Sequence, residues 1–185
     1  MSCRKGCAYC CHHYVTVSVA HAISIVDYLY KKRKWLTRFL ANYETWLDSG
    51  YAIADHIDRE RLSAQSASRT IDRILQDTRP LSERYFEMNI TCPFLVDGRC
   101  FIYELRPLSC SGHFSTSPCD WCSPGSREDP DLHNMIPNDH DLMEIARITD
   151  HRLVMYELSL PIMIYRLLTE GSADVMEEVV RHDAR

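Results

Sequence analysis

Several features that would indicate a specialised class of protein are missing from this chain of 185 residues. No stretch approaches the roughly 20 uninterrupted apolar residues that a membrane-spanning helix needs. Only six glycines and eight prolines are present, which excludes a fibrous or low-complexity chain. No apolar run precedes the first cysteine, so we expect no signal peptide and a cytoplasmic location, and we leave open whether residues precede Met1.

Positive charge is also scarce, which argues against nucleic-acid binding. The formal net charge is −5, whereas proteins that neutralise phosphates are usually basic. The one basic run, residues 31–34, is expected to be a solvated helix end. A glycine-rich nucleotide-binding signature is missing as well. We therefore expect neither nucleic acid nor membrane as a partner, and keep a protein partner or protein substrate open.

Cysteine, by contrast, is abundant and grouped. Residues 1–14 hold four of the nine cysteines and residues 92–125 hold the other five. In a reducing compartment disulfides are rare, and clustered thiols usually bind metals or carry out redox chemistry. An odd number would also leave one thiol outside any complete set of disulfides.

The cysteine-free blocks, residues 15–91 and 138–185, repeat apolar residues at helical spacing. We expect one helix to begin after Ser18, a second to end near Ser49-Gly50 and a third to stop at Arg79-Pro80. Three more helices are expected: one over 142–153, one from Pro161 to Gly171, and one after Ser172. The polar segment 123–141 is expected to be a long loop. The predicted fold class is all-α, as a single domain of residues 1–185 with a cysteine-rich, loop-rich metal-binding centre.

The first cysteine group reads Cys3-x3-Cys7-x2-Cys10-Cys11. On a helix, positions 3, 7 and 10 share one face, so three thiolates can converge on one metal. A fourth ligand has to come from elsewhere, so we expect this group to meet the second one in space. Neighbouring side chains diverge by about 100° on a helix, so Cys10 and Cys11 are expected to serve neighbouring metals rather than one ion.

The second group opens with Cys92 and Cys100 on either side of Asp97-Gly98, a tight-turn signal. An ideal hairpin would pair Cys100 with Leu95 and turn Cys92 to the opposite face. If both thiols bind one centre, we expect a loop without strand pairing in place of the hairpin.

Cys110 follows an Arg106-Pro107 pair. Pro107 disfavours helical geometry at Arg106 and can bend the chain so that Cys110 returns towards Cys100. Arg106 is a candidate cofactor-binding residue, because a guanidinium beside thiolates offsets negative charge and donates to sulfur. Capping the carboxyl end of a helix is the alternative role.

Cys119-x2-Cys122 has the spacing of a metal knuckle and completes a predicted ligand set of all nine cysteines. His12, His13 and His113 are further candidates, since imidazole can replace thiolate. A histidine beside a metal centre is more often a supporting group than a ligand. No catalytic residue is predicted.

Together these motifs resemble the zinc- or iron-chelating cysteine-cluster family, often called YkgJ-like or CxxxCxxCC proteins. The matching residues are Cys3, Cys7, Cys10, Cys11, Cys92, Pro93, Phe94, Leu95, Cys100, Ile102, Tyr103, Arg106, Pro107 and Cys110. The resemblance implies a small cytoplasmic metal-binding protein of undefined role. An enzyme that methylates lysine in flagellin is similar to the same family and is thought to carry an iron–sulfur cluster. This chain departs from the pattern in adding Cys119 and Cys122.

The metal and its role remain alternatives at this point. Seven family cysteines exceed the four that one zinc ion or one [4Fe–4S] cluster uses, and the irregular spacing favours iron–sulfur. We expect a metal-binding protein, with a cluster-assisted protein-modifying enzyme and a zinc-stabilised partner-binding module as alternatives. The spacing C-x3-C-x2-C also occurs in radical S-adenosylmethionine enzymes, but these need strand–helix repeats that the helical pattern lacks.

Overall fold

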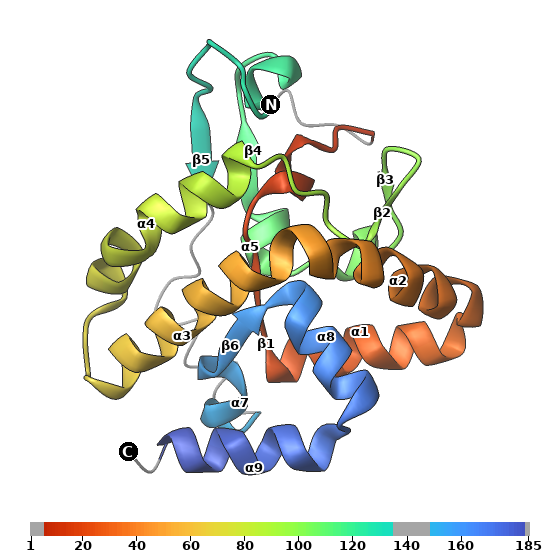
Figure 1. Cartoon of the computed structure of the whole chain (residues 1–185), viewed down its shortest axis with the longest axis vertical. Helices are drawn as coiled ribbons and strands as arrows, with labels where there is room; N and C mark the ends of the chain where they lie inside the picture. The colour runs from red at the N-terminus through yellow and green to blue at the C-terminus, as the bar shows by residue number, and fades with distance from the viewer. Residues whose placement is uncertain (1–5, 135–148, 184–185) are drawn as a thin grey trace.

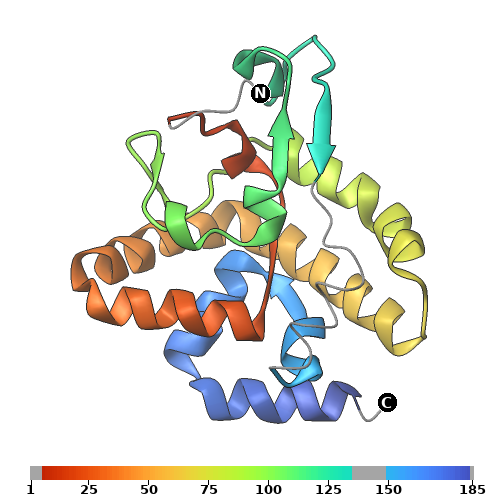
Figure 2. The same cartoon turned by 180° about the vertical axis from the view of Figure 1, so that it is seen from behind.

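The computed structural model describes residues 6–134 and 149–183, and these are mainly helical, as predicted. The helices pack around a central pair of short strands (Figures 1 and 2). The helices are α1 (Val19–Lys31), α2 (Arg33–Trp46), α3 (Ala52–Ser66), α4 (Ile71–Glu87), α5 (Leu108–Ser111), α7 (His151–Met155), α8 (Leu160–Thr169) and α9 (Ser172–Asp183). The strands are β1 (Thr16–Ser18), β2 (Leu95–Val96), β3 (Arg99–Cys100), β4 (His113–Ser115), β5 (Leu132–Asn134) and β6 (Glu157–Ser159).

The expected ends of two helices are confirmed. The Ser18 side chain caps α1 by accepting a hydrogen bond from the backbone N–H of His21. Pro161 lies in the first turn of α8, where its missing N–H costs no hydrogen bond. The chain leaves α8 at Gly171, whose φ of +90° favours glycine.

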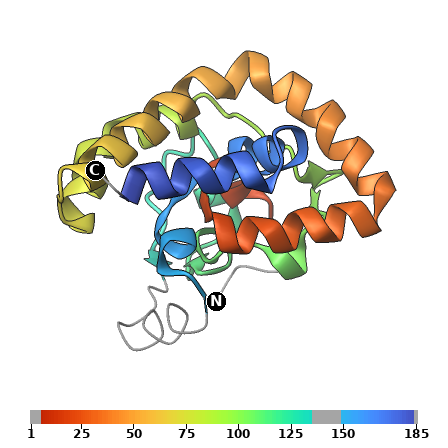
Figure 3. The ribbon, with the colours of Figure 1, turned by 90° about the horizontal axis from the view of Figure 1, so that it is seen from below.

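The predicted helix end at Ser49-Gly50 is wrong. A wide helical turn, η2 (Leu47–Tyr51), joins α2 directly to α3, and the two form one bent helix that arcs around α8 and α9 when seen from below (Figure 3). Gly50 is required here for another reason: a Cβ at this position would lie 2.5 Å from Nε1 of Trp46. Glycine therefore makes room for a buried indole rather than ending the helix.

The predicted stop at Arg79-Pro80 is also wrong, because Pro80 lies inside α4. A proline removes one backbone hydrogen bond, and Pro80 lies on the exposed face, where water can satisfy the freed carbonyl. On the opposite face, Ile74, Thr78 and Tyr85 are buried and hold the helix against α3.

The core joins α1, the bent helix and α8. In α1, Val19, Ala22, Ile25 and Leu29 are fully buried. In the bent helix the buried face contains Phe39, Tyr43, Trp46, Ala54 and Ile57, and in α8 it runs from Leu160 to Ile164 and includes Leu167. The basic run 31–34 is exposed between α1 and α2, as expected.

Short strands were not expected, and three two-stranded ladders are present among the described residues. β1 pairs antiparallel with β6 in the register Val17 to Leu158. β4 pairs with β5, which lies in the segment 123–141 that was expected to be a loop. Elements of three residues are too short to give an alternating pattern, so sequence periodicity could not reveal them.

One expected helix falls largely outside the described residues. Most of the predicted helix 142–153 lies there, and its described end is α7, which Asp150 caps. No helix within 6–134 and 149–183 has the length and apolar character that crossing a membrane requires.

Candidate metal centre

Five of the nine cysteines line one small apolar cavity, which we call the cysteine cavity. Its volume is about 30 Å³. The lining thiols are those of Cys10, Cys11, Cys92, Cys100 and Cys110. They come from the N-terminal segment, the β2–β3 region and α5, so the fold gathers thiols that lie up to a hundred positions apart.

The N-terminal segment does not form the expected α-helix where it is described. A turn at Gly6, with φ of +97°, leads into a short 3-10 helix, η1 (Tyr9–His12). Cys10 and Cys11 both line the cysteine cavity, and their expected service to neighbouring metals stays a prediction. Each of the two thiols is also the largest cause of the pKa shift of the other.

The expected meeting of the two cysteine groups is confirmed for the residues that the structure describes. The backbone N–H of Cys92 donates to the carbonyl oxygen of Cys11 over 2.8 Å. This bond places the start of the second group directly beside the end of the first.

The turn at Asp97-Gly98 does form a hairpin, with Leu95 opposite Cys100 as the ideal register requires. The expected conflict with a shared centre does not arise. Cys92 precedes the strand, in a turn closed by the bond from Leu95 N–H to the Cys92 carbonyl. This turn redirects the chain, so both Cys92 and Cys100 line the same cavity.

Aromatic packing fixes this hairpin on α2. The Phe94 ring is fully buried and stacks on Phe39, with centroids 4.7 Å apart. The Asn42 side-chain amide donates to the carbonyl of Pro93 over 2.8 Å. Phe101 stacks on Trp35 at 4.9 Å and is partly buried against the core.

Arg106 lies at the end of a turn and beside the thiols, and its role towards a cofactor stays a prediction. Its Nε donates to the carbonyl of Tyr103 at the end of a 3-10 turn, and its guanidinium stacks on the exposed Tyr103 ring. Arg106 also lines the cysteine cavity, where its charge lowers the pKa of Cys100 and Cys110 against the larger effect of burial. The extended backbone at Arg106 and the turn at Pro107 bring Cys110 back, as expected.

The thiols of the cavity differ in acidity. Burial raises the pKa of Cys92 to about 12 and that of Cys110 well above its usual value. The hydrogen bond from Cys11 lowers the pKa of Cys10 to about 7, against the opposing effect of burial. Cys10 is therefore the thiol of this group that most readily becomes a thiolate without a cation.

His13 lines the cysteine cavity, and His12 and His113 lie near His13. The His13 ring stacks on Phe86, with centroids 4.2 Å apart. Burial, with smaller contributions from His113 and His12, lowers the pKa of His13 to about 4, so this ring is neutral. The Nδ1 atom of His12 is buried and has no hydrogen-bond partner within the described parts of the chain. Neutral imidazoles of this kind are competent metal ligands.

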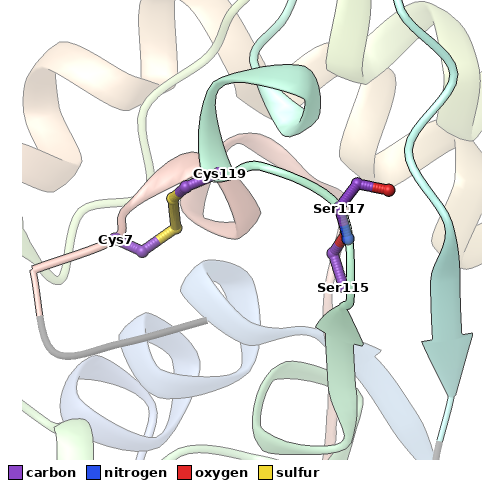
Figure 4. Close-up of a disulfide and its surroundings, with 4 residues drawn as sticks. All are labelled: Cys7, Ser115, Ser117 and Cys119. Carbon is purple, nitrogen blue, oxygen red and sulfur yellow. A yellow bond between two sulfur atoms is a disulfide. The ribbon is translucent and has the colours of Figure 1, made fainter. Parts of the chain in front are cut away.

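The remaining cysteines are placed differently. Cys7 and Cys119 form a disulfide between the N-terminal segment and the turn η4 (Cys119–Cys122) (Figure 4). In this state their sulfurs are bonded to each other and are not thiolate ligands. Cys122 is half-buried at the other end of η4 and does not line the cysteine cavity. Cys3 lies outside the described residues.

Hydrogen bonds fix the loop that carries Cys119. The backbone N–H of Ser117 donates to Oγ of Ser115, and the Ser117 hydroxyl accepts from the N–H of Asp131 (Figure 4). These bonds tie the loop to the β4–β5 ladder, which positions Cys119 opposite Cys7.

The thiols of the cavity are gathered but not yet in ligand geometry. Among residues 6–134 and 149–183, no three His, Cys, Asp or Glu side chains are arranged so that they could hold one metal ion. A metal centre here would therefore require another arrangement of the cysteine side chains. The predicted ligand role stays a prediction.

Sequence reasoning missed Tyr14 and Asp58. Tyr14 lines the cysteine cavity, and its hydroxyl donates to Oδ1 of Asp58, which also accepts from Ser159 N–H over 2.8 Å. Asp58 is buried, and its pKa is raised to about 7, with burial as the largest cause. The available signal was its place four residues after Ala54, on the buried face of a helix.

Comparisons with protein-family models, with curated proteins and with solved structures find no match to this chain.

Proposed function

We propose that this protein binds a metal centre in the cysteine cavity, as an iron–sulfur cluster or zinc. The observation that carries the proposal is the convergence of five thiols from three separate segments on one buried cavity. Cysteine is a favoured buried residue, but burial alone does not bring together thiols so far apart in sequence. The ligands would be drawn from Cys10, Cys11, Cys92, Cys100 and Cys110.

Electrostatics supports this reading. Burial is the largest cause of the raised pKa of Cys110, and the charges of Cys92, Cys10 and Cys100 raise it further, so thiolates in this cavity repel one another. A bound cation would offset that repulsion and couple metal binding to folding. Arg106 supplies one positive charge at the cavity edge, which suits a centre with net negative charge.

The thiol count favours iron–sulfur over a single zinc ion. One zinc ion uses four ligands that all lie about 2.3 Å from one point. A polynuclear cluster binds each cysteine at a different iron and so accepts a wider spread of thiols. A fifth thiol beside four ligands would serve as a supporting group.

A second candidate is a cluster-assisted enzyme that modifies a protein. The observation that favours it is an open cleft of about 550 Å³ next to the cysteine cavity. Tyr14 lines both, and Ser109, which precedes Cys110, lines the cleft. A substrate group in this cleft would approach the centre at Tyr14.

The test compares Cys92→Ser, Cys110→Ser and the matched control Cys122→Ser, all purified without oxygen from cells supplied with iron. We expect the first two variants to lose most of the bound metal and the control to retain it. Equal metal content in all three variants would show that the cysteine cavity is not the binding site.

A further inference from the structure

A second small cavity shares part of its wall with the cysteine cavity. Its volume is about 40 Å³, and we call it the Cys7 cavity. The cysteines that line it are Cys7, Cys10, Cys11 and Cys100, and the last three line the cysteine cavity as well. Cys7 therefore lies beside thiols of the proposed metal site, but its sulfur is held in the disulfide with Cys119 (Figure 4).

The other half of this disulfide lies on a turn that carries a further cysteine. Cys119 begins η4 and Cys122 ends it. Cys122 is half-buried and is not part of a disulfide. Neither Cys119 nor Cys122 lines the cysteine cavity or the Cys7 cavity. A bond between these two cysteines would therefore leave the walls of both cavities unchanged except for a free thiol at Cys7.

The geometry of η4 suits such a bond. The backbone N–H of Ser123 donates to the carbonyl of Asp120 over 3.1 Å, as in a 3-10 helix. In a 3-10 helix, with three residues per turn and a rise of about 2.0 Å per residue, side chains three positions apart lie on one face and their Cα atoms are about 6 Å apart. Disulfides join Cα atoms that are about 4.4–6.8 Å apart. Cys119 and Cys122 therefore meet the distance requirement of a disulfide within the turn.

We propose that Cys122 displaces Cys7 from the disulfide with Cys119, so that the bond moves into η4 and the Cys7 thiol is released to the proposed metal site. The Cys122 thiolate attacks Sγ of Cys119, and the electron pair of the broken bond leaves with Sγ of Cys7. The proton that Cys122 loses is taken up by Cys7, or goes to solvent when a cation binds the Cys7 thiolate. One disulfide is present before and after the exchange, so the step consumes neither an oxidant nor a reductant.

Metal binding and this exchange favour each other. A released Cys7 would bring the thiols around the Cys7 cavity to four, the number that one zinc ion uses. A bound cation stabilises thiolates, so it favours the state in which Cys7 is free. This inference rests on the proposed function and adds its regulation: the Cys7–Cys119 bond predominates without metal and the Cys119–Cys122 bond with metal. It also gives a role to Cys122, which metal binding in the cysteine cavity leaves unused.

Mapping of the disulfide in the full chain, with and without zinc, tests the proposal. Metal-free oxidised protein is incubated without reductant or oxygen, with either Zn²⁺ or a chelator. Free thiols are then blocked with N-ethylmaleimide at about pH 5, where few thiols are thiolates and exchange is slow. We expect peptide mass spectrometry to show that Zn²⁺ raises the ratio of Cys119–Cys122 to Cys7–Cys119 at least about tenfold.

Two variants tie this shift to Cys122. Cys122→Ser should keep the Cys7–Cys119 bond with and without zinc, because the attacking thiol is missing. Ser123→Ala, the next residue along the chain, is the matched control and should shift like the wild type. Wild-type protein that binds zinc and keeps the Cys7–Cys119 bond would overturn the proposal.

A third variant tests the new bond without any metal. Cys7→Ser leaves Cys119 without its partner, and we expect air oxidation of this metal-free variant to join Cys119 to Cys122. Absence of that bond would overturn the exchange, even if Cys122→Ser folded poorly. A wild type that binds no zinc would contradict the proposed function instead, and the disulfide of Cys7→Ser would still decide whether η4 accepts the bond.

Discussion

Tyr14 donates its hydroxyl hydrogen bond to Oδ1 of Asp58 over 2.5 Å, and this contact separates two cavities with different chemistry. Tyr14 lines the cysteine cavity, and Asp58 lines a separate cavity of about 490 Å³ between the bent helix and α8. The bond joins the N-terminal segment to the middle of α3 and is fixed further by the N–H of Ser159. A change at Asp58 should therefore be measurable as a change in stability.

Asp58 should make the protein less stable as the pH rises. Burial raises its pKa from 3.8 to about 7, against opposing effects of Tyr14, Ser159 and Arg61. The unfolded chain therefore loses this proton first. The protonated Asp58 side chain contributes fully to the free energy of unfolding below about pH 3.8, and this contribution is lost as the pH rises through about 7. Relative to Asp58→Asn, the wild type should lose up to about 4 kcal/mol over this window.

Urea unfolding of the wild type and Asp58→Asn between pH 4 and about 8 measures this difference. Asp77→Asn, on the exposed face of α4, is the control and should follow the wild type at a constant offset. Parallel pH profiles for the wild type and Asp58→Asn would contradict the raised pKa.

Gly50→Ala should destabilise the protein by about 1–3 kcal/mol. The added methyl group would meet the Trp46 indole, whose Nε1 donates to the Tyr85 hydroxyl over 2.9 Å. Relief of the clash would move the indole and weaken that bond. Thermal unfolding of Gly50→Ala beside Ser49→Ala, an exposed neighbour, provides the comparison. A stability equal to that of Ser49→Ala would show that the turn accepts a side chain.

Removal of the disulfide should matter only in oxidising solution. Cys7 and Cys119 close a loop across 112 positions, so Cys119→Ser should lower the free energy of unfolding by about 2–4 kcal/mol without reductant. With dithiothreitol present, the wild type and the variant should unfold alike, and Cys122→Ser should resemble the wild type in both. A loss that persists in reductant would assign Cys119 a role other than the disulfide, such as that of a metal ligand.

Local signals in the sequence predicted much of the helical framework. Ser18, Pro161 and Gly171 each act within a few residues of their own position, so their effects are readable without the fold. Gly50 and Pro80 were misread because their effects depend on tertiary surroundings: a buried indole beside one and solvent beside the other.

The candidate site was only partly readable from the sequence. Cysteine spacing predicted that Cys10 and Cys11 meet the second group, and the structure confirms this. The pairing of Cys7 with Cys119 depends on loops that no motif describes. Asp58 becomes notable only when α3 is placed against β6, because an aspartate in a helix is usually solvated.

The most direct measurement is the amount of iron, zinc and acid-labile sulfide per chain in wild-type protein purified without oxygen and supplied with iron and sulfide. We expect iron and sulfide in similar amounts, with a broad absorbance near about 400 nm that disappears in air. Zinc alone under these conditions would preserve the metal centre but change its identity, in favour of a structural or partner-binding role. Protein that retains neither metal would contradict the central claim that the cysteine cavity is a metal site.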